Sequence, residues 1–216
     1  MRVALIGATG FVGSQILKEL VERNQSIKAF ARNVEKVPAS KNVATVALDV
    51  NNVQALATDL KGADVVISAF NAGWTNPNLY EDFIKGAKAI EEATKLAGVK
   101  RLIVIGGAGS LYVTDDLQLV DTPDFPEQIK PGALAARDYY NILKEDNDLD
   151  WTMFSPAPEM HQGTSGTRQG TYRLGTDNPV FDADGHSILS VEDVAVVIAD
   201  EVENAKFIKQ RFTAAY

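Results

Sequence analysis

A glycine-rich turn close to the N-terminus constrains the fold of this chain more than any other feature. The run Gly7–Gly13 (GATGFVG) follows a short apolar segment, Val3–Ile6, and leads into a segment of helical periodicity, Phe11–Glu22. Glycines at this spacing let the backbone turn sharply and leave the free N–H groups of the helix start open to a phosphate. A plain glycine-rich turn could carry the same letters, but the strand–turn–helix context favours a dinucleotide-binding βαβ unit.

Short apolar runs alternate with helix-period segments along most of the chain. This alternation is typical of a parallel sheet whose strands are joined by helices on both faces. We therefore expect an α/β fold, a Rossmann doubly wound parallel sheet. The expected strands are Val3–Ile6, Ile27–Ala31, Ala44–Leu48, Asp64–Ala69, Arg101–Ile105 and Trp151–Phe154, and the expected helices are Phe11–Glu22, Val53–Leu60, Asn78–Ala97 and Ala133–Lys144.

Two stretches interrupt this alternation. Gly106–Gly132 is long for a connection in an α/β unit, so we expect it to carry local structure or a function. The region after the sixth strand is rich in Gly, Ser, Thr and Pro, until Ser190 marks the N-cap of a last helix and Arg211–Thr213 a last strand. Because no repeat or linker is visible, we expect a single domain, with a dinucleotide-binding core over residues 1–155 and a small C-terminal elaboration on the substrate side over residues 156–216.

Composition narrows the classes of function. The chain has 29 Asp and Glu against 21 Lys and Arg, a formal charge of −8, which argues against nucleic acid or an anionic membrane as partner. It has no cysteine, and its only histidines are His161 and His186, so we expect no disulfide and no metal site. No apolar run reaches the roughly 18 residues of a membrane helix, and the first residues lack the layout of a signal peptide. We therefore expect a cytoplasmic protein that acts on a small molecule; its oligomeric state stays open.

The end of the second strand indicates which dinucleotide is bound. Where NAD sites carry Asp or Glu for the ribose hydroxyls, this chain has Ala31-Arg32-Asn33. Arg32 can pair with a 2′-phosphate, although an arginine in a solvent-facing loop is also common, and the sequence favours NADP over NAD as the cofactor. Asp49, just after the third strand, is either an adenine contact beside Val50 or a cap of the next helix.

The loops after the fourth, fifth and sixth strands are expected to line the cofactor together with the glycine turn. In an open parallel sheet, ligands lie over the carboxyl ends of the strands. The predicted cofactor-binding residues are Gly7, Ala8, Thr9, Gly10, Phe11, Val12, Arg32, Asp49, Val50, Ala69, Phe70, Asn71, Gly106, Gly107 and Pro156.

Several further motifs together resemble one known family. Essentially the whole chain is similar to the atypical short-chain dehydrogenase/reductase group of NADH-flavin reductase-like and NAD(P)-binding epimerase-like proteins. More distantly, it resembles biliverdin/flavin reductase and NADP-sensing nitrogen-repression regulators. The resemblance implies a Rossmann fold with a nucleotide over Gly7–Val12, and it transfers fold and cofactor better than substrate. Besides the glycine run, the motifs are Ile105–Leu111, Asp121–Pro126, Leu149–Trp151, Phe154–Ala157, Tyr172–Gly175, Ser190–Asp193 and Arg211–Thr213.

The catalytic pair of the wider superfamily is the element of this resemblance that the chain lacks. Ordinary members use Tyr-x-x-x-Lys, in which the lysine lowers the pKa of the tyrosine. Tyr140 and Lys144 have this spacing. Measured from Leu149–Trp151, however, the superfamily lysine would fall near Ala136 and the tyrosine near Gly132. We therefore interpret the Tyr140–Lys144 spacing as accidental.

Other positions are candidates for chemistry or for substrate contact. Ser110 lies close to the superfamily's catalytic serine, although its glycine neighbours also fit a simple turn. His161 is an outside candidate for a proton donor. Trp74, Tyr172 and Arg173 lie in segments expected to cover the nicotinamide end, where aromatic walls would suit a flat substrate; packing of irregular loops is the alternative.

These features favour an NADPH-dependent reductase that passes hydride to a flat acceptor such as a flavin. Such a transfer depends on holding donor against acceptor, and it needs no protein acid where solvent supplies the proton. Two alternatives remain: a non-catalytic NADP-sensing regulatory module, and a sugar-nucleotide epimerase-like enzyme, whose chemistry depends on the missing tyrosine.

Overall fold

An eight-stranded sheet forms the centre of the computed structural model, which describes all residues from 1 to 216. The strand order is β3-β2-β1-β4-β5-β8-β10-β9, and only β9 runs antiparallel to its neighbour. The strands of this sheet are β1 (Arg2–Ile6), β2 (Ser26–Ala31), β3 (Val43–Ala47), β4 (Val65–Ser68), β5 (Arg101–Ile105), β8 (Asp150–Phe154), β9 (Arg173–Gly175) and β10 (Gln210–Ala215).

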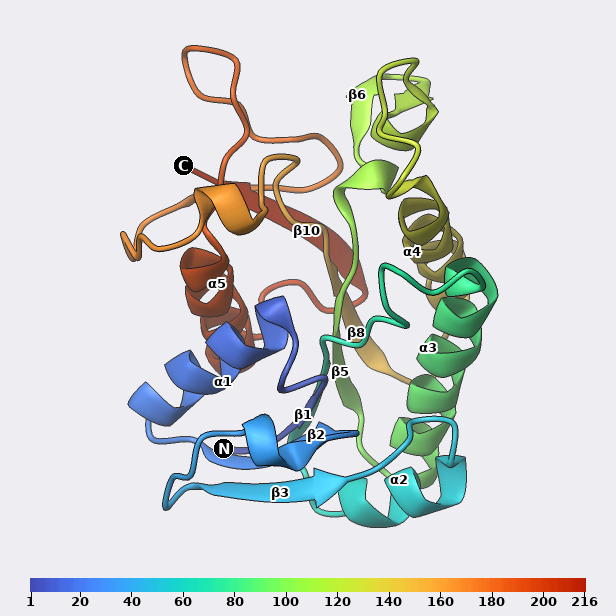
Figure 1. The fold of residues 1–216 in the computed structure, drawn as a ribbon, viewed down its shortest axis with the longest axis vertical. Helices are drawn as coiled ribbons and strands as arrows, with labels where there is room; N and C mark the ends of the chain where they lie inside the picture. Colours follow the sequence, from blue (N-terminus) through green and yellow to red (C-terminus); the bar gives the residue numbers. More distant parts are fainter.

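Five helices cover the two faces of the sheet (Figure 1). α1 and α5 pack on one face, and α2, α3 and α4 pack on the other. Along β1, Leu5 belongs to the first core and Ala4 to the second, because successive side chains of a strand point to opposite faces. The helices are α1 (Phe11–Glu22), α2 (Val53–Leu60), α3 (Leu79–Leu96), α4 (Lys130–Leu143) and α5 (Val191–Asn204).

The expected doubly wound sheet is confirmed, with small shifts at element ends. The largest is at α4, which begins at Lys130 rather than Ala133 because Pro131, with its preset φ, suits the first helical turn. Ser190 caps α5 as expected: its Oγ accepts a hydrogen bond from the Asp193 N–H at 3.1 Å. None of the five helices is both long and apolar enough to cross a membrane.

The C-terminal residues complete the sheet. β10 inserts between β8 and β9, and Phe212 packs in the same core as Leu5 of β1. The expected last strand, Arg211–Thr213, is therefore correct in place but is longer at both ends. The short edge strand β9 was not expected.

The long stretch Gly106–Gly132 does carry local structure. A 3-10 turn, Ala108–Ser110, leads into the hairpin of β6 (Tyr112–Thr114) and β7 (Leu117–Gln118). The Tyr112 N–H donates to the Asp177 carbonyl at 2.8 Å, so the hairpin lies against the loop that follows β9. Figure 1 shows the hairpin and this loop projecting beyond the same end of the sheet.

Candidate functional site

The direction of winding reverses between β1 and β4. The chain proceeds from β1 through β2 to β3 on one side, and from β4 through β5 to β8 on the other. The loops after β1 and β4 therefore meet, and a Cβ at Gly7 would lie only 2.4 Å from the Ala69 carbonyl oxygen. Doubly wound sheets bind ligands at such a switch point, beyond the carboxyl ends of the strands.

Each glycine of the turn has a separate geometric role. Gly7 adopts φ +81°, and a Cβ at Gly13 would lie 2.1 Å from the Gly7 carbonyl oxygen. At Gly10, a Cβ would meet only that same oxygen, at 3.3 Å, so its outer side is open. The N–H groups of Phe11 and Val12 donate to no acceptor in the chain. This open turn with free amides at a helix start fits the pyrophosphate of a dinucleotide.

Arg32 follows β2 at the expected adenosine end of the site. Its side chain is exposed and makes no hydrogen bond or ion pair within the chain. Asp49 follows β3 close by, and Val50 beside it is buried. The pKa of Asp49 is lowered mainly because the backbone and side-chain N–H groups of Asn51 donate to its carboxylate. The positive charges of Arg32 and Lys85 lower this pKa further. The Arg32 guanidinium thus follows β2 without a partner in the chain.

The reading of Asp49 as a helix cap is wrong. Asn52 caps α2, because its side-chain oxygen accepts from the Ala55 N–H at 3.2 Å. Asp49 instead closes a tight turn by accepting from Asn51, at 2.9 Å from both the backbone and the side-chain nitrogen. Its carboxylate remains at the edge of the sheet where the parallel strands have their carboxyl ends.

The loop after β4 presents its backbone, not the Phe70 ring, at the carboxyl edge. Phe70 packs on Phe83 of α3, with ring centroids 6.0 Å apart, and its ring occupies the space above Gly86. Asn71 accepts from the Gly73 N–H at 2.7 Å and so shapes the turn toward Trp74. We therefore expect this loop to meet a ligand through main-chain groups.

The loop after β5 packs closely against the start of α4, because both segments have small residues where they meet. A Cβ at Gly107 would lie 3.5 Å from that of Ala136, and a Cβ at Gly109 would lie 2.9 Å from that of Ala133. Gly132 and Ala136, where the superfamily tyrosine and lysine would fall, carry no group that can transfer a proton. Pro156, after β8, is buried at the same edge.

Tyr140 is not activated by Lys144. The Lys144 Nζ lies over the Tyr140 ring, 4.9 Å from its centroid, and the Arg211 guanidinium lies at the same distance. The edge of the ring packs on Trp151, with centroids 6.2 Å apart. Burial raises the pKa of Tyr140, opposite to the change that proton transfer near neutral pH requires.

Ser110 is held by an arginine that the sequence did not single out for the site. Arg211 of β10 donates through Nη1 to the Ser110 carbonyl at 2.7 Å and to its Oγ at 3.0 Å, and through Nε to Asp177 at 3.0 Å. Ser110 and Arg211 are both buried. The only signal in the sequence was the motif Arg211–Thr213, which supported the family resemblance without a role for its arginine.

Trp74, predicted to contact the substrate, lies in the loop after β4 and is largely exposed. Its side chain is 60% exposed, and its ring rests on the start of α4, where a Cβ at Gly132 would lie 2.8 Å from Cζ3. Leu79 of α3 contacts the same place. The ring thus packs on the start of α4, and much of it remains exposed.

The prediction that Tyr172 covers the nicotinamide end of the site is wrong. Its hydroxyl donates to Asp200 at 2.5 Å, and Asp200 also pairs with Arg23 at 2.7 Å. Arg23 ends α1 at the end farthest from the glycine turn, so the Tyr172 ring points along α5 and away from the site. The sequence could not show this because the contact joins residues 28 positions apart.

Arg173 and His161 are both engaged in local structure. Arg173 donates to the carbonyl oxygens of Tyr216 and Phe181 and so holds two loop segments together. His161 accepts from the Gly163 N–H at 3.0 Å and begins the 3-10 turn Gln162–Thr164.

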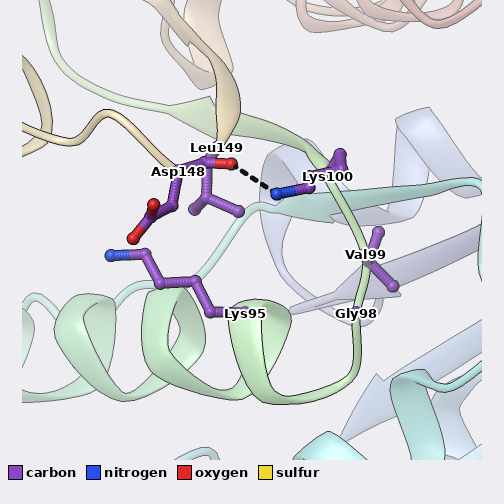
Figure 2. A pocket seen from close by; sticks show the side chains of 6 residues that line it. All are labelled: Lys95, Gly98, Val99, Lys100, Asp148 and Leu149. Atoms are coloured by element: carbon purple, nitrogen blue, oxygen red, sulfur yellow. Dashed lines mark hydrogen bonds between the residues drawn. The ribbon is translucent and has the colours of Figure 1, made fainter.

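Two hollows of about 220 Å³ lie away from this edge. One lies between α5 and β9–β10 and includes Tyr172. The other, shown in Figure 2, lies between the end of α3 and the start of β8, and the side chains of Lys95 and Asp148 point toward one another across it. There, Lys100 donates to the Asp148 carbonyl at 3.2 Å. No group of three or more metal-binding side chains occurs in the chain.

Comparison with known proteins agrees with this geometry. Residues 7–205 match the model of a family described as NAD(P)H-binding. The chain belongs to this NAD(P)H-binding family. Its cofactor is therefore a nicotinamide dinucleotide, and the family's match begins at the first glycine of the turn.

Relatives within the family cover the whole chain. YwnB of Bacillus subtilis, an uncharacterized protein, is 35% identical over 99% of this chain and 97% of its own. The crystal structure of a presumed epimerase from Bacteroides thetaiotaomicron is 40% identical, with a TM-score of 0.91 over 100% of this chain and 96% of that one. The crystal structure of a presumed NADH-flavin reductase from Streptococcus pneumoniae is 34% identical, with a TM-score of 0.86 over 100% of this chain and 99% of that one.

Curated relatives with a named activity are longer than this chain. The NAD(P)H azoreductase of Xenophilus azovorans is 26% identical over 72% of this chain. The matched region covers 47% of the azoreductase.

Proposed function

We propose that this protein is an NADPH-dependent reductase that delivers hydride to a flat small-molecule acceptor. Its membership of the NAD(P)H-binding family supports the cofactor, and relatives named as an NADH-flavin reductase and an NAD(P)H azoreductase support the reaction class. One observation carries the proposal further: the glycine turn is intact, while Gly132 and Ala136 replace the proton-transferring pair.

The two parts of the chain share the work in this proposal. Residues 1–155 hold the cofactor, with the pyrophosphate on the amides of Phe11 and Val12 and a 2′-phosphate on Arg32. Asp49 and Val50 lie beside the adenine, and the loops after β4 and β5 face the nicotinamide through their main chains. Residues 156–216 close the acceptor side of the site.

When bound, the reduced nicotinamide would supply one hydride to the acceptor, which takes one proton from water and leaves reduced by two electrons. The chain's own residues orient the acceptor, because water can supply the proton. An exposed indole gives a flat acceptor a face to stack on, and we assign this role to Trp74.

Ser110 is the candidate hydrogen-bond donor to the acceptor. Arg211 can only donate, so the Ser110 Oγ accepts from it and keeps its own proton free for another partner. Arg211 acts here as a positioning residue. An epimerase mechanism is disfavoured because it needs the missing acid.

The proposal is tested by mixing purified protein with NADPH and a panel of quinones, flavins and dyes, and following the loss of NADPH absorbance. We expect oxidation of NADPH that depends on acceptor. Tight NADPH binding with no oxidation by any acceptor would instead support the sensing module.

A variant tests the stacking role separately. We expect Trp74→Ala to raise the acceptor KM about two- to tenfold, since stacking on an aromatic ring contributes roughly 0.5–1.5 kcal/mol beyond the buried area. Trp74→Phe should restore most of the loss. Leu96→Ala, which changes another exposed apolar residue at the far end of α3, is the matched control and should leave KM unchanged.

The proposed place of action is the cytoplasm, where NADPH is regenerated. Cell fractionation tests this directly, and recovery outside the cell would contradict it.

A further inference from the structure

We propose that the acceptor is a flat ring system that carries no phosphate or other anionic group. Uncharged and cationic quinones, dyes and dephosphorylated flavin belong to this class, and flavin phosphates do not. The inference rests on the proposed reductase function and narrows its substrate by charge.

Two chain segments frame the acceptor side of the site. They are residues 111–130, which contain the β6–β7 hairpin, and residues 171–188, which contain β9 and the loop after it. Two hydrogen bonds hold them together, from the Tyr112 N–H to the Asp177 carbonyl and from the Asn178 side chain to the Tyr112 carbonyl, both 2.8 Å long. Figure 1 shows both segments projecting beyond the carboxyl ends of β5, β8 and β10, where the acceptor must approach the nicotinamide.

These two segments carry most of the chain's net negative charge. They contain eight carboxylates and only two cations, Lys130 and Arg173, so they carry a formal −6 of the chain's −8. The carboxylates are Asp115, Asp116, Asp121, Asp124, Glu127, Asp177, Asp182 and Asp184.

The cations of this region are already occupied. Lys130 pairs with Glu127 at 3.1 Å, and Arg211 is bound to Asp177 and Ser110. Arg137 pairs with Asp121 at 3.2 Å. Arg173 donates to two backbone carbonyls.

Several carboxylates remain without a partner as a result. Neither Asp115 nor Asp116, at the exposed tip of the hairpin, makes an ion pair or a side-chain hydrogen bond. At the opposite end of the site, Arg32 and Lys36 are exposed and make no ion pair, and they offset the neighbouring carboxylates of Glu35 and Asp49. The unpaired carboxylates therefore oppose a phosphate at the acceptor end, whereas Arg32 and Lys36 can offset one at the adenosine end.

The expected size of this effect can be stated for one matched pair of acceptors. Riboflavin and FMN share the same ring, but FMN adds a phosphate with nearly two negative charges at neutral pH. If several like charges stood about 10 Å from that phosphate, in high effective dielectric, they would reduce affinity roughly tenfold at low salt. The difference should shrink to about twofold in 1 M salt, where the screening length is about 3 Å.

The test measures binding and turnover side by side in the full-length protein. Dissociation constants of riboflavin and FMN are measured on NADP⁺-loaded protein by flavin fluorescence, at low and at high salt. Oxidation of NADPH by each flavin and by menadione, an uncharged quinone, is then followed. We expect riboflavin to bind about tenfold more tightly than FMN at low salt, with the gap closing at high salt.

Two double variants give the matched comparison. Asp115→Asn with Asp116→Asn should improve FMN binding severalfold and leave riboflavin unchanged. Glu145→Gln with Asp148→Asn removes the same charge from exposed positions past the far end of α4 and should alter neither flavin.

The outcomes separate the inference from the function on which it rests. FMN binding as tightly as riboflavin at low salt, or failure of riboflavin to bind, would overturn the charge rule. If riboflavin binds more tightly than FMN but no acceptor oxidises NADPH, the charge rule stands and the reductase proposal fails.

Discussion

The carbonyl oxygen of Gly7 lies 2.1 Å from the place that a Cβ at position 13 would occupy. The third glycine of the turn is therefore required by the backbone of the first, and it lets α1 start directly against β1. At the middle glycine, the same oxygen is 3.3 Å away, and the remaining side is open. Packing of the fold thus depends on Gly13, whereas access for a ligand depends on Gly10.

This contrast predicts different effects on stability. We expect Gly13→Ala to lower the free energy of unfolding by about 2–3 kcal/mol, because the Gly7 backbone must move to accept the methyl group. Gly10→Ala should change it by less than about 1 kcal/mol. Urea unfolding of both variants measures the difference, and equal stabilities would contradict these separate roles.

Arg32 should distinguish the two nicotinamide cofactors. We expect Arg32→Ala to weaken NADPH binding about ten- to hundredfold and NADH binding little, since only NADPH carries the phosphate and a charged hydrogen bond contributes roughly 1.5–3 kcal/mol. Calorimetric titrations with both cofactors measure this, and Lys61→Ala, an exposed cation away from the site, is the control. Equal losses for both cofactors would make Arg32 a surface residue only.

Tyr140 should be dispensable for turnover. Its hydroxyl makes no hydrogen bond in the chain, and its ring packs on Trp151, so Tyr140→Phe keeps the packing and changes stability by less than about 0.5 kcal/mol. We expect reductase activity to stay within a few-fold of the parent. A collapse of turnover with unchanged NADPH affinity would restore the ordinary tyrosine–lysine mechanism.

Glu19 should make stability depend on pH. Its burial opposes the charged form, but hydrogen bonds from Arg168 and Arg23 outweigh this and hold the pKa of Glu19 below its usual range. A lowered pKa stabilises the folded state at pH values above the ordinary glutamate pKa of about 4.3, and this contribution is lost as the pH falls through the folded value.

Comparison of the parent with Glu19→Gln isolates this contribution. We expect the variant to be clearly less stable at about pH 6 and the two proteins to converge below about pH 4. A gap in unfolding free energy that does not change with pH would show that Glu19 contributes through packing alone.

The parts of the fold that depend on local pattern could be predicted from the sequence. Fully buried strands such as β4 appear as unbroken apolar runs, and the N-cap Ser190 bonds a residue only three positions away. The glycine turn follows an apolar strand run and leads directly into a helix, so both of its neighbours can be seen in the local sequence. It therefore predicts the cofactor class without any long-range contact.

Features that depend on distant contacts could not be predicted. Asp193 is buried and accepts from the Gln169 and Gly170 N–H groups, both at 2.8 Å, which places the preceding segment against α5. Tyr172 follows that segment, and its partner Asp200 lies 28 residues away. Nothing in the pattern around Tyr172 marks this pairing, so its expected place at the nicotinamide end was wrong.

Steady-state oxidation of NADPH by riboflavin in the parent and in Gly10→Val tests the central claim most directly. A β-branched side chain at Gly10 projects to the open side, where the pyrophosphate must approach the free amides of Phe11 and Val12. We expect turnover in the parent and none in the variant, with both proteins showing similar circular dichroism. Equal turnover in a folded Gly10→Val protein, or no turnover in the parent, would contradict it.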